Sequence, residues 1–216
     1  MKLIFAGDPM CSWCYGFGKE LGALMDRHPE LPLHILVGGV RAGATDLLDD
    51  GGKQFRLTHW ARVEEASGLP FNRVAFVARQ NFVYDTEPVC RAVVAAQRLA
   101  PAADQLAVFR ALQHAFYVDG LDTTSGDVLA GAAVAALARQ GIDLPPAAFR
   151  AEWDHAATIA ATAAQFAEVR AMGIRSFPAL LLEVDGRVIE ISPGYAHVDQ
   201  LDRQLQSALQ QSAAAA

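Results

Sequence analysis

The sequence predicts an α/β protein in which a small mixed β-sheet is interrupted by a large helical insertion. Three observations support this fold class. A strand–helix–strand pattern occupies residues 2–37, an alanine-rich helical stretch covers about residues 45–172, and a strand–strand–helix pattern follows from residue 179. The two outer pieces together supply four strands, so they are expected to form one sheet.

This pattern predicts two domains in a chain of 216 residues. The helical insertion is too long to be a loop, so it is expected to form a subdomain of its own. The expected boundaries are residues 1–40 and 160–216 for the discontinuous sheet domain and residues 41–159 for the helical domain.

The first unit begins with a short apolar run, Leu3 to Ala6, that predicts a buried strand. A helix is predicted over residues 12–27, where His28-Pro29 closes it. Residues 33–37 predict a second strand, and parallel pairing of this strand with the first would require a right-handed crossover. The helix is supported by an apolar stripe with helical spacing, formed by Phe17, Leu21, Leu24 and Met25.

The helical stretch is divided by capping residues, prolines and glycines. Asp85 to Pro88 is typical of a helix start, and that helix is predicted to end at Leu99. Pro101 is predicted to open the next helix, which ends near Tyr117. The remaining expected helices are one capped by Thr123 to Ser125 and ended by Gly141, one starting at Pro145-Pro146, and a long one that ends at Met172-Gly173.

The end of the chain returns to strand periodicity. Residues 179–184 and 187–191 predict two strands joined by the two-residue turn Asp185-Gly186. A last helix carries Val198, Leu201, Leu205 and Leu209 on one face, and residues 210–216 are expected to form a frayed tail.

Composition limits the possible partners. The net charge is −6 and basic residues do not cluster, which argues against binding of nucleic acid. No apolar run approaches the ~18 residues of a membrane span, so no membrane partner is expected. The four apolar residues after Lys2 are far fewer than those of a secretory leader, and we expect a cytoplasmic protein.

The motif Cys11-Ser12-Trp13-Cys14 lies where the first strand gives way to the first helix. Unpaired N–H groups and the positive end of the helix dipole favour a thiolate there, and the thiolate is the nucleophile of disulfide exchange. Cys11 is expected to attack because it lies nearest the helix start, and Cys14 is expected to resolve the mixed disulfide. A zinc site is a weaker interpretation, since Cys90 is the one other cysteine and no histidine pair has ligand spacing. An inert pair or a disulfide staple is the remaining alternative.

A resemblance to a known family extends over nearly the whole chain. A CxxC after the first strand resembles the thioredoxin fold, and the helical insertion resembles the DsbA family. Gly173 to Pro178 is similar to the cis-proline loop of that family. The segments around the CxxC, at 85–91 and at 109–122 are similar to the FrnE-like, cytoplasmic branch. This chain departs from the branch at three positions, having Ser12, Cys90 and Asp85 where proline, histidine and asparagine are frequent.

The resemblance implies a dithiol–disulfide oxidoreductase or isomerase acting on protein or peptide disulfides, with no metal or organic cofactor. It implies a catalytic Pro178 with a cis peptide bond, and a substrate-binding surface of Ser12, Trp13, Ser176 and Phe177 beside the two cysteines. Simple core packing is the alternative role for Trp13. Cys90 is expected to be a buried cysteine without a catalytic role.

Two other functions remain open from the sequence. One is a glutathione-dependent isomerase or transferase that resembles the hydroxychromene-carboxylate isomerases, although these usually carry serine at the position of Cys11. The other is a client-binding module whose CxxC is regulatory. Glutathione is a further candidate partner. In the reducing cytosol a strongly oxidising dithiol would stay reduced, so reduction or isomerisation is expected there in preference to net oxidation.

Overall fold

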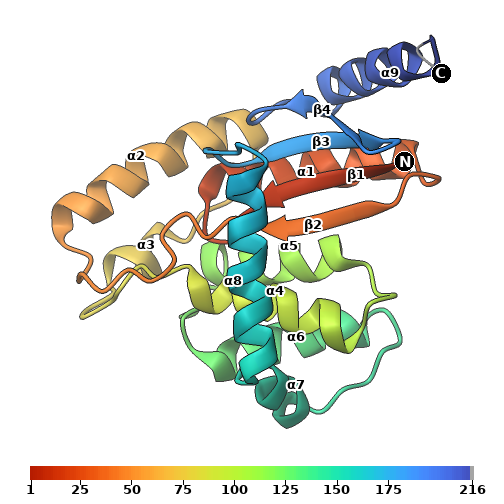
Figure 1. The fold of residues 1–216 in the computed structure, drawn as a ribbon. Helices are drawn as coiled ribbons and strands as arrows, with labels where there is room; N and C mark the ends of the chain where they lie inside the picture. The colour runs from red at the N-terminus through yellow and green to blue at the C-terminus, as the bar shows by residue number, and fades with distance from the viewer. Residues whose placement is uncertain (215–216) are drawn as a thin grey trace.

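The computed structural model describes residues 1–214, which form one four-stranded sheet and nine helices (Figure 1). The strands are β1 (Lys2–Gly7), β2 (Leu33–Val37), β3 (Ala179–Val184) and β4 (Arg187–Ser192). The helices are α1 (Ser12–Arg27), α2 (Asp50–Ser67), α3 (Arg73–Val77), α4 (Glu87–Leu99), α5 (Gln105–Tyr117), α6 (Gly126–Ala138), α7 (Pro146–Trp153), α8 (Ala156–Ala171) and α9 (Val198–Ala214).

The sheet has the predicted mixed topology. Its strand order is β2-β1-β3-β4, with β1 parallel to β2 and antiparallel to β3. The β3–β4 hairpin turns at Asp185 and Gly186, whose φ angles of 51° and 76° are those that a two-residue turn requires. The predicted fold class is therefore confirmed.

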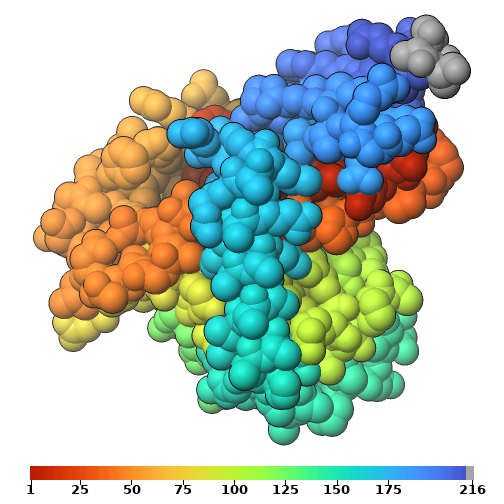
Figure 2. All heavy atoms as spheres, in the orientation of Figure 1, coloured from red at the N-terminus to blue at the C-terminus, as the bar shows by residue number. Residues whose placement is uncertain are grey.

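Alternate residues of β1 face two separate layers of core. Leu3 and Phe5 belong to the large core shared with α1, whereas Ile4 and Ala6 belong to a small core that includes Val169 of α8. Figures 1 and 2 show α8 crossing the front of the molecule from the helical region to the sheet. The sheet is thus covered on both faces, as its apolar strands require.

The exposed edge of β2 is closed by two glutamines. Gln165 of α8 accepts a hydrogen bond from the Val37 N–H at 3.0 Å, and Gln97 of α4 donates to the Ile35 carbonyl at 2.9 Å. The two amides also bond to each other at 2.8 Å. These bonds satisfy backbone groups that an edge strand leaves unpaired.

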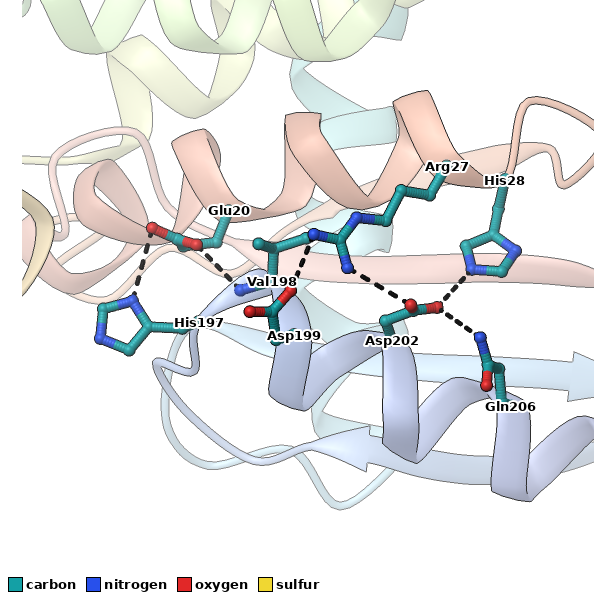
Figure 3. Close-up of polar contacts among 8 residues, drawn as sticks. All are labelled: Glu20, Arg27, His28, His197, Val198, Asp199, Asp202 and Gln206. Atoms are coloured by element: carbon teal, nitrogen blue, oxygen red, sulfur yellow. Dashed lines mark hydrogen bonds and ion pairs between the residues drawn. The ribbon is translucent and has the colours of Figure 1, made fainter.

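Helix α9 is fixed to α1 by a row of polar contacts, shown in Figure 3. The buried carboxylate of Glu20 accepts a hydrogen bond at 2.8 Å from the Val198 N–H, in the first turn of α9. Arg27 pairs with Asp199 at 2.8 Å, and His28 Nε2 lies 2.7 Å from an oxygen of Asp202. The row holds α1 against α9.

The predicted helix boundaries are wrong at two places. Helix α5 begins at Gln105 and not at Pro101, because Asp104 caps it by accepting a bond from the Ala107 N–H at 3.0 Å. The prediction of a frayed tail is wrong for residues 210–214, which continue α9. The helix extends there because alanine is the best helix former and because Ser212 is buried. Residues 215–216 of that predicted tail lie outside the described residues.

The two-domain division remains a prediction, and its boundary at residue 160 falls inside α8. That helix contacts both β2 and α4, so it belongs to neither side alone. Among residues 1–214 no helix combines the length and apolar character needed to cross a membrane.

Candidate active site

The first helix begins at the CxxC motif. Cys11 occupies the N-cap position in extended conformation, and its carbonyl accepts the first helical bond from the Tyr15 N–H at 3.0 Å. Cys11 is partly exposed, whereas Cys14 is completely buried one turn into the helix; both are free thiols. The strand-to-helix transition thus leaves Cys11 partly exposed and buries Cys14.

The surroundings separate the two thiols in acidity. A hydrogen bond from the Cys14 thiol lowers the pKa of Cys11 below its ordinary value, against burial and the charge of Asp8, which raise it. Burial raises the pKa of Cys14 well above its ordinary value, and its bond to Cys11 adds to that shift. The thiolate therefore forms first on Cys11, and Cys14 stays protonated to donate to it.

Asp8 is a buried carboxylate directly before the motif. Its two oxygens accept hydrogen bonds from the backbone N–H groups of Met10 at 2.8 Å and Val40 at 2.7 Å. Burial raises the pKa of Asp8 to about 6, although bonds from Thr86, these two N–H groups and Cys90 lower it. Asp8 thus joins the segment before Cys11 to the loop after β2.

The predicted cis-proline loop lies against Cys11. The Phe177–Pro178 peptide bond is cis, as expected. The Cys11 sulfur lies 3.7 Å from the Phe177 carbonyl oxygen, at hydrogen-bond distance for a thiol donor. The Phe177 ring packs on Gly38, where a Cβ atom would come within 2.2 Å of it. Ser176 is exposed, and its contact with a substrate remains a prediction.

Trp13 combines features of both roles considered for it. The side chain is partly buried, and its ring packs on the ring of Tyr195 with centroids 5.5 Å apart. The Tyr195 hydroxyl donates to the Ala66 carbonyl of α2 at 3.0 Å. Trp13 therefore packs on one side and remains partly accessible, as does Ser12.

Sequence reasoning missed an aromatic support behind the motif. The Tyr84 hydroxyl donates to the Met10 carbonyl at 2.5 Å, and the Arg56 guanidinium lies 4.1 Å from the centre of the Tyr84 ring. Tyr84 lies outside any segment with helical or strand periodicity, so the spacing of apolar residues did not indicate its role. The motif is thus held in place by a residue 74 positions away in the sequence.

Cys90 is buried, as predicted. Cys90 is among the groups that lower the pKa of the buried Asp8, so it lies behind the motif. Within residues 1–214 no three histidine, cysteine or acidic side chains are grouped as a metal site would require. His114 and His155 are exposed surface residues; His155 caps α8 by accepting from the Ala157 N–H at 3.1 Å.

Comparison with known proteins places this fold and sequence in a family. No family model and no curated protein sequence matches the chain. Among solved structures, a candidate protein disulfide isomerase from Nitrosomonas europaea is 30% identical, with a TM-score of 0.83 over 98% of this chain and 99% of that one. The cytosolic disulfide reductase DsbM from Pseudomonas aeruginosa is 26% identical, with a TM-score of 0.78 over 98% and 100% of the two chains.

DsbM has also been solved with GSH, and that structure is 25% identical to this chain over 97% and 100% of the two chains, with a TM-score of 0.76. The likeness to these proteins extends over both the sheet and the helical insertion, and it accompanies a free CxxC at the start of α1. The chain belongs to the DsbA family of thioredoxin-fold oxidoreductases that act on thiols and disulfides.

Proposed function

We propose that this protein is a dithiol–disulfide oxidoreductase or isomerase that acts on protein or peptide disulfides through Cys11 and Cys14. One observation carries the proposal: a partly exposed cysteine whose thiol has a lowered pKa lies at the start of a helix, with a buried protonated thiol next to it. This is the arrangement in which one cysteine attacks and the other releases the product.

The reaction has two displacement steps. The Cys11 thiolate attacks one sulfur of the substrate disulfide; that S–S bond breaks, and the other substrate sulfur leaves as a thiolate that takes a proton from water. Cys14 then loses its proton and attacks the Cys11 sulfur, which breaks the mixed disulfide and releases the second substrate thiol. Two electrons pass from the protein dithiol to the substrate, and a Cys11–Cys14 disulfide is left.

The neighbouring loop supplies the proposed substrate contacts. Phe177 presents its carbonyl oxygen 3.7 Å from the Cys11 sulfur, which supports a peptide position along Ser176, Phe177 and Pro178. Trp13 and Ser12, both partly accessible, form the opposite side of the proposed contact. Cys11 is partly exposed and Ser176 is exposed, which supports access of a peptide chain at this place.

A small thiol of the glutathione class is the proposed electron donor. The related DsbM is a cytosolic disulfide reductase whose structure has been solved with GSH, and it supports both this donor and action as a reductase. We place the protein in the cytoplasm on the same ground. In that compartment the dithiol is kept reduced, so it acts as a reductase or isomerase.

The test compares serine variants of the three cysteines with a model protein disulfide as substrate. Cys14→Ser keeps the attacking thiolate but removes the resolving thiol, so mixed disulfides with substrate or glutathione should accumulate and be seen by mass spectrometry. Cys11→Ser should lose activity and trap nothing, because a serine hydroxyl does not ionise near neutral pH. Cys90→Ser is the matched control and should retain turnover without adducts.

Equal turnover by the wild type and Cys11→Ser would refute this mechanism. It would direct attention to a glutathione-dependent isomerase or to a client-binding protein with a regulatory CxxC. Adducts that form on Cys14 in the Cys11→Ser variant would instead reverse the two assigned roles.

A further inference from the structure

A cleft lies beside α5 and α6, and neither cysteine of the CxxC motif lines it, although Tyr15, which follows Cys14, does. It has a volume of about 920 Å³, within the usual range for small-molecule sites. Part of its lining consists of small side chains, which we call the floor. The floor residues are Ala107 and Ala111 of α5 and Gly131, Ala132 and Ala135 of α6. Larger side chains of the same helices, Arg110, Gln113, His114, Asp127 and Val128, also line the cleft.

The Arg110 side chain, which lines this cleft, rests on two glycines of α1 that are not themselves part of the lining. Gly18 and Gly22 are one helical turn apart, and the Arg110 side chain lies along them. A Cβ atom at Gly18 would lie 3.3 Å from Arg110 Cγ, and one at Gly22 would lie 3.1 Å from Arg110 Nη1. Glycine destabilises a helix interior relative to alanine. The space for this arginine is thus obtained at the expense of helix stability.

A buried amide without partners belongs to the same cleft. The Gln113 side chain lines it and is 1% exposed, yet neither its oxygen nor its nitrogen has a hydrogen-bond partner among the described residues. A buried polar group without a hydrogen-bond partner destabilises the fold. Such a group at the wall of a cleft indicates a place where a polar ligand atom is accommodated.

The cleft is lined by two arginines, Arg110 and Arg139, and two aspartates, Asp119 and Asp127, which differ in their partners. Neither arginine pairs with a carboxylate among the described residues, whereas both aspartates have a partner. Asp119 pairs with His114 at 3.1 Å, and Asp127 pairs with Arg150 at 3.4 Å. Arg110 has no carboxylate partner within the described chain, although it lies close enough to Tyr15 to favour ionisation of that hydroxyl, whose pKa burial raises to about 12. An uncompensated guanidinium over an apolar floor is complementary to a molecule with an apolar body and an anionic group.

We propose that the α5–α6 cleft is a binding site for an amphipathic organic anion, whose charged group bonds to Arg110 and whose apolar body lies on the alanine floor. Gln113 is the second polar contact of this site. The cleft does not include either cysteine of the motif, and the function inferred for that motif does not depend on it.

Two fluorescent probes with the same ring system test the proposal. 8-Anilinonaphthalene-1-sulfonate carries a sulfonate, and N-phenyl-1-naphthylamine lacks it. The wild type should bind both saturably at one site. Arg110→Gln should weaken binding of the sulfonate probe about tenfold, as expected for one charge-assisted hydrogen bond, and leave the neutral probe unchanged. Arg170→Gln makes the same charge change on the exposed end of α8 and should have no effect.

A glycine on the cleft floor allows a matched steric test. A Cβ atom at Gly131 meets nothing within 4 Å, so larger side chains fit there without clashes and improve helix propensity. Gly131→Leu should abolish binding of both probes by filling the cleft, whereas Gly131→Ala should preserve it. Cys11→Ser should bind like the wild type, which separates this site from the active site.

Near-ultraviolet circular dichroism of each variant verifies that probe fluorescence does not report unfolding. The proposal is overturned if the wild type shows no saturable binding, if Gly131→Leu binds as well as Gly131→Ala, or if Arg110→Gln and Arg170→Gln weaken the sulfonate probe equally.

Discussion

The two ends of α1 stabilise charges of opposite sign. At its N-terminus the Cys11 sulfur is stabilised by hydrogen bonds from Cys14 and Trp13 and lies near a buried carboxylate. At its C-terminus Arg27 and the neighbouring His28 lie beside carboxylates of α9, at 2.8 Å and 2.7 Å (Figure 3). Both ends follow the helix dipole, which favours an anion at the start and a cation at the end.

The difference is in what surrounds the charge. Hydrogen bonds at the N-terminus lower the pKa of Cys11, which is partly exposed as a residue. Contacts at the C-terminus join α1 to α9 and occupy the side chains of Arg27 and His28. Under the proposed function, the first end carries the reactive thiol and the second fixes the position of the helix, so substitutions at the two ends should have different readouts.

The largest effect is expected from Asp8→Asn at the reactive end. Folding raises the pKa of Asp8 from 3.8 to about 6, so the folded chain favours the protonated acid. The wild type should therefore lose about 3 kcal/mol of stability as the pH rises from about 4 to 6 and beyond, since two pKa units correspond to that energy. The difference in unfolding free energy between wild type and variant, followed by urea titration against pH, should show this loss.

The same variant should also lower the pKa of Cys11. The charge of Asp8 raises the pKa of Cys11, so Asp8→Asn should shift the thiolate titration, measured by ultraviolet absorbance, to lower pH. Asp46→Asn removes an exposed charge in the loop after β2 and is the control. An unchanged Cys11 titration in Asp8→Asn would mean that solvent screens the carboxylate.

A smaller effect is expected from Glu20→Gln at the α1–α9 contact. Its buried carboxylate accepts from the Val198 N–H, and Gln keeps an acceptor there but loses the negative charge at the start of α9. Unfolding free energy should fall by about 1 kcal/mol, the usual gain from a charged group at a helix end. Glu30→Gln, an exposed acid after α1, is the matched control. A loss of disulfide reduction without a loss of stability would contradict the assignment of this contact to structure alone.

The smallest effect is expected from Asp202→Asn. The hydrogen bond from His28 lowers the pKa of Asp202, so this carboxylate stabilises the fold above the ordinary aspartate pKa and loses that contribution as the pH falls through its folded-state value. The thermal midpoint of the variant should lie slightly below that of the wild type, and added salt should narrow the gap. Asp26→Asn on α1 is the control, and a gap independent of salt would count against an ionic origin.

Local patterns predicted much of the fold. The apolar run before Cys11, the stripe on α1 and the Asp185-Gly186 turn each depend on a few neighbouring residues, and all three are found in the structure. The start of α5 was mispredicted because Asp104 competes with Pro101 as the local start signal, and the sequence alone does not rank them. The structure shows that Asp104 caps the helix, so α5 begins at Gln105.

The parts of the site that were not predicted depend on distant contacts. The bond from Tyr84 to Met10 and the packing of Phe177 on Gly38 join segments that only the fold brings together. The α5–α6 cleft was missed for a related reason. Its floor is made of small residues, and these looked in the sequence like ordinary helix formers. The cis bond at Pro178 was predicted from the family resemblance, because few bonds that precede proline are cis.

The glycines of α1 have a consequence for the protein before it is folded. Gly16, Gly18 and Gly22 each lower the tendency of this segment to be helical, and Gly16 sits where a Cβ atom would meet Val63 of α2 at 2.9 Å. The segment therefore forms its helix only when α2, α5 and α9 are present to pack against it. Without that packing Cys11 has no helix start and no Cys14 donor beside it, so we expect its thiol in an unfolded chain to have the pKa of an ordinary cysteine.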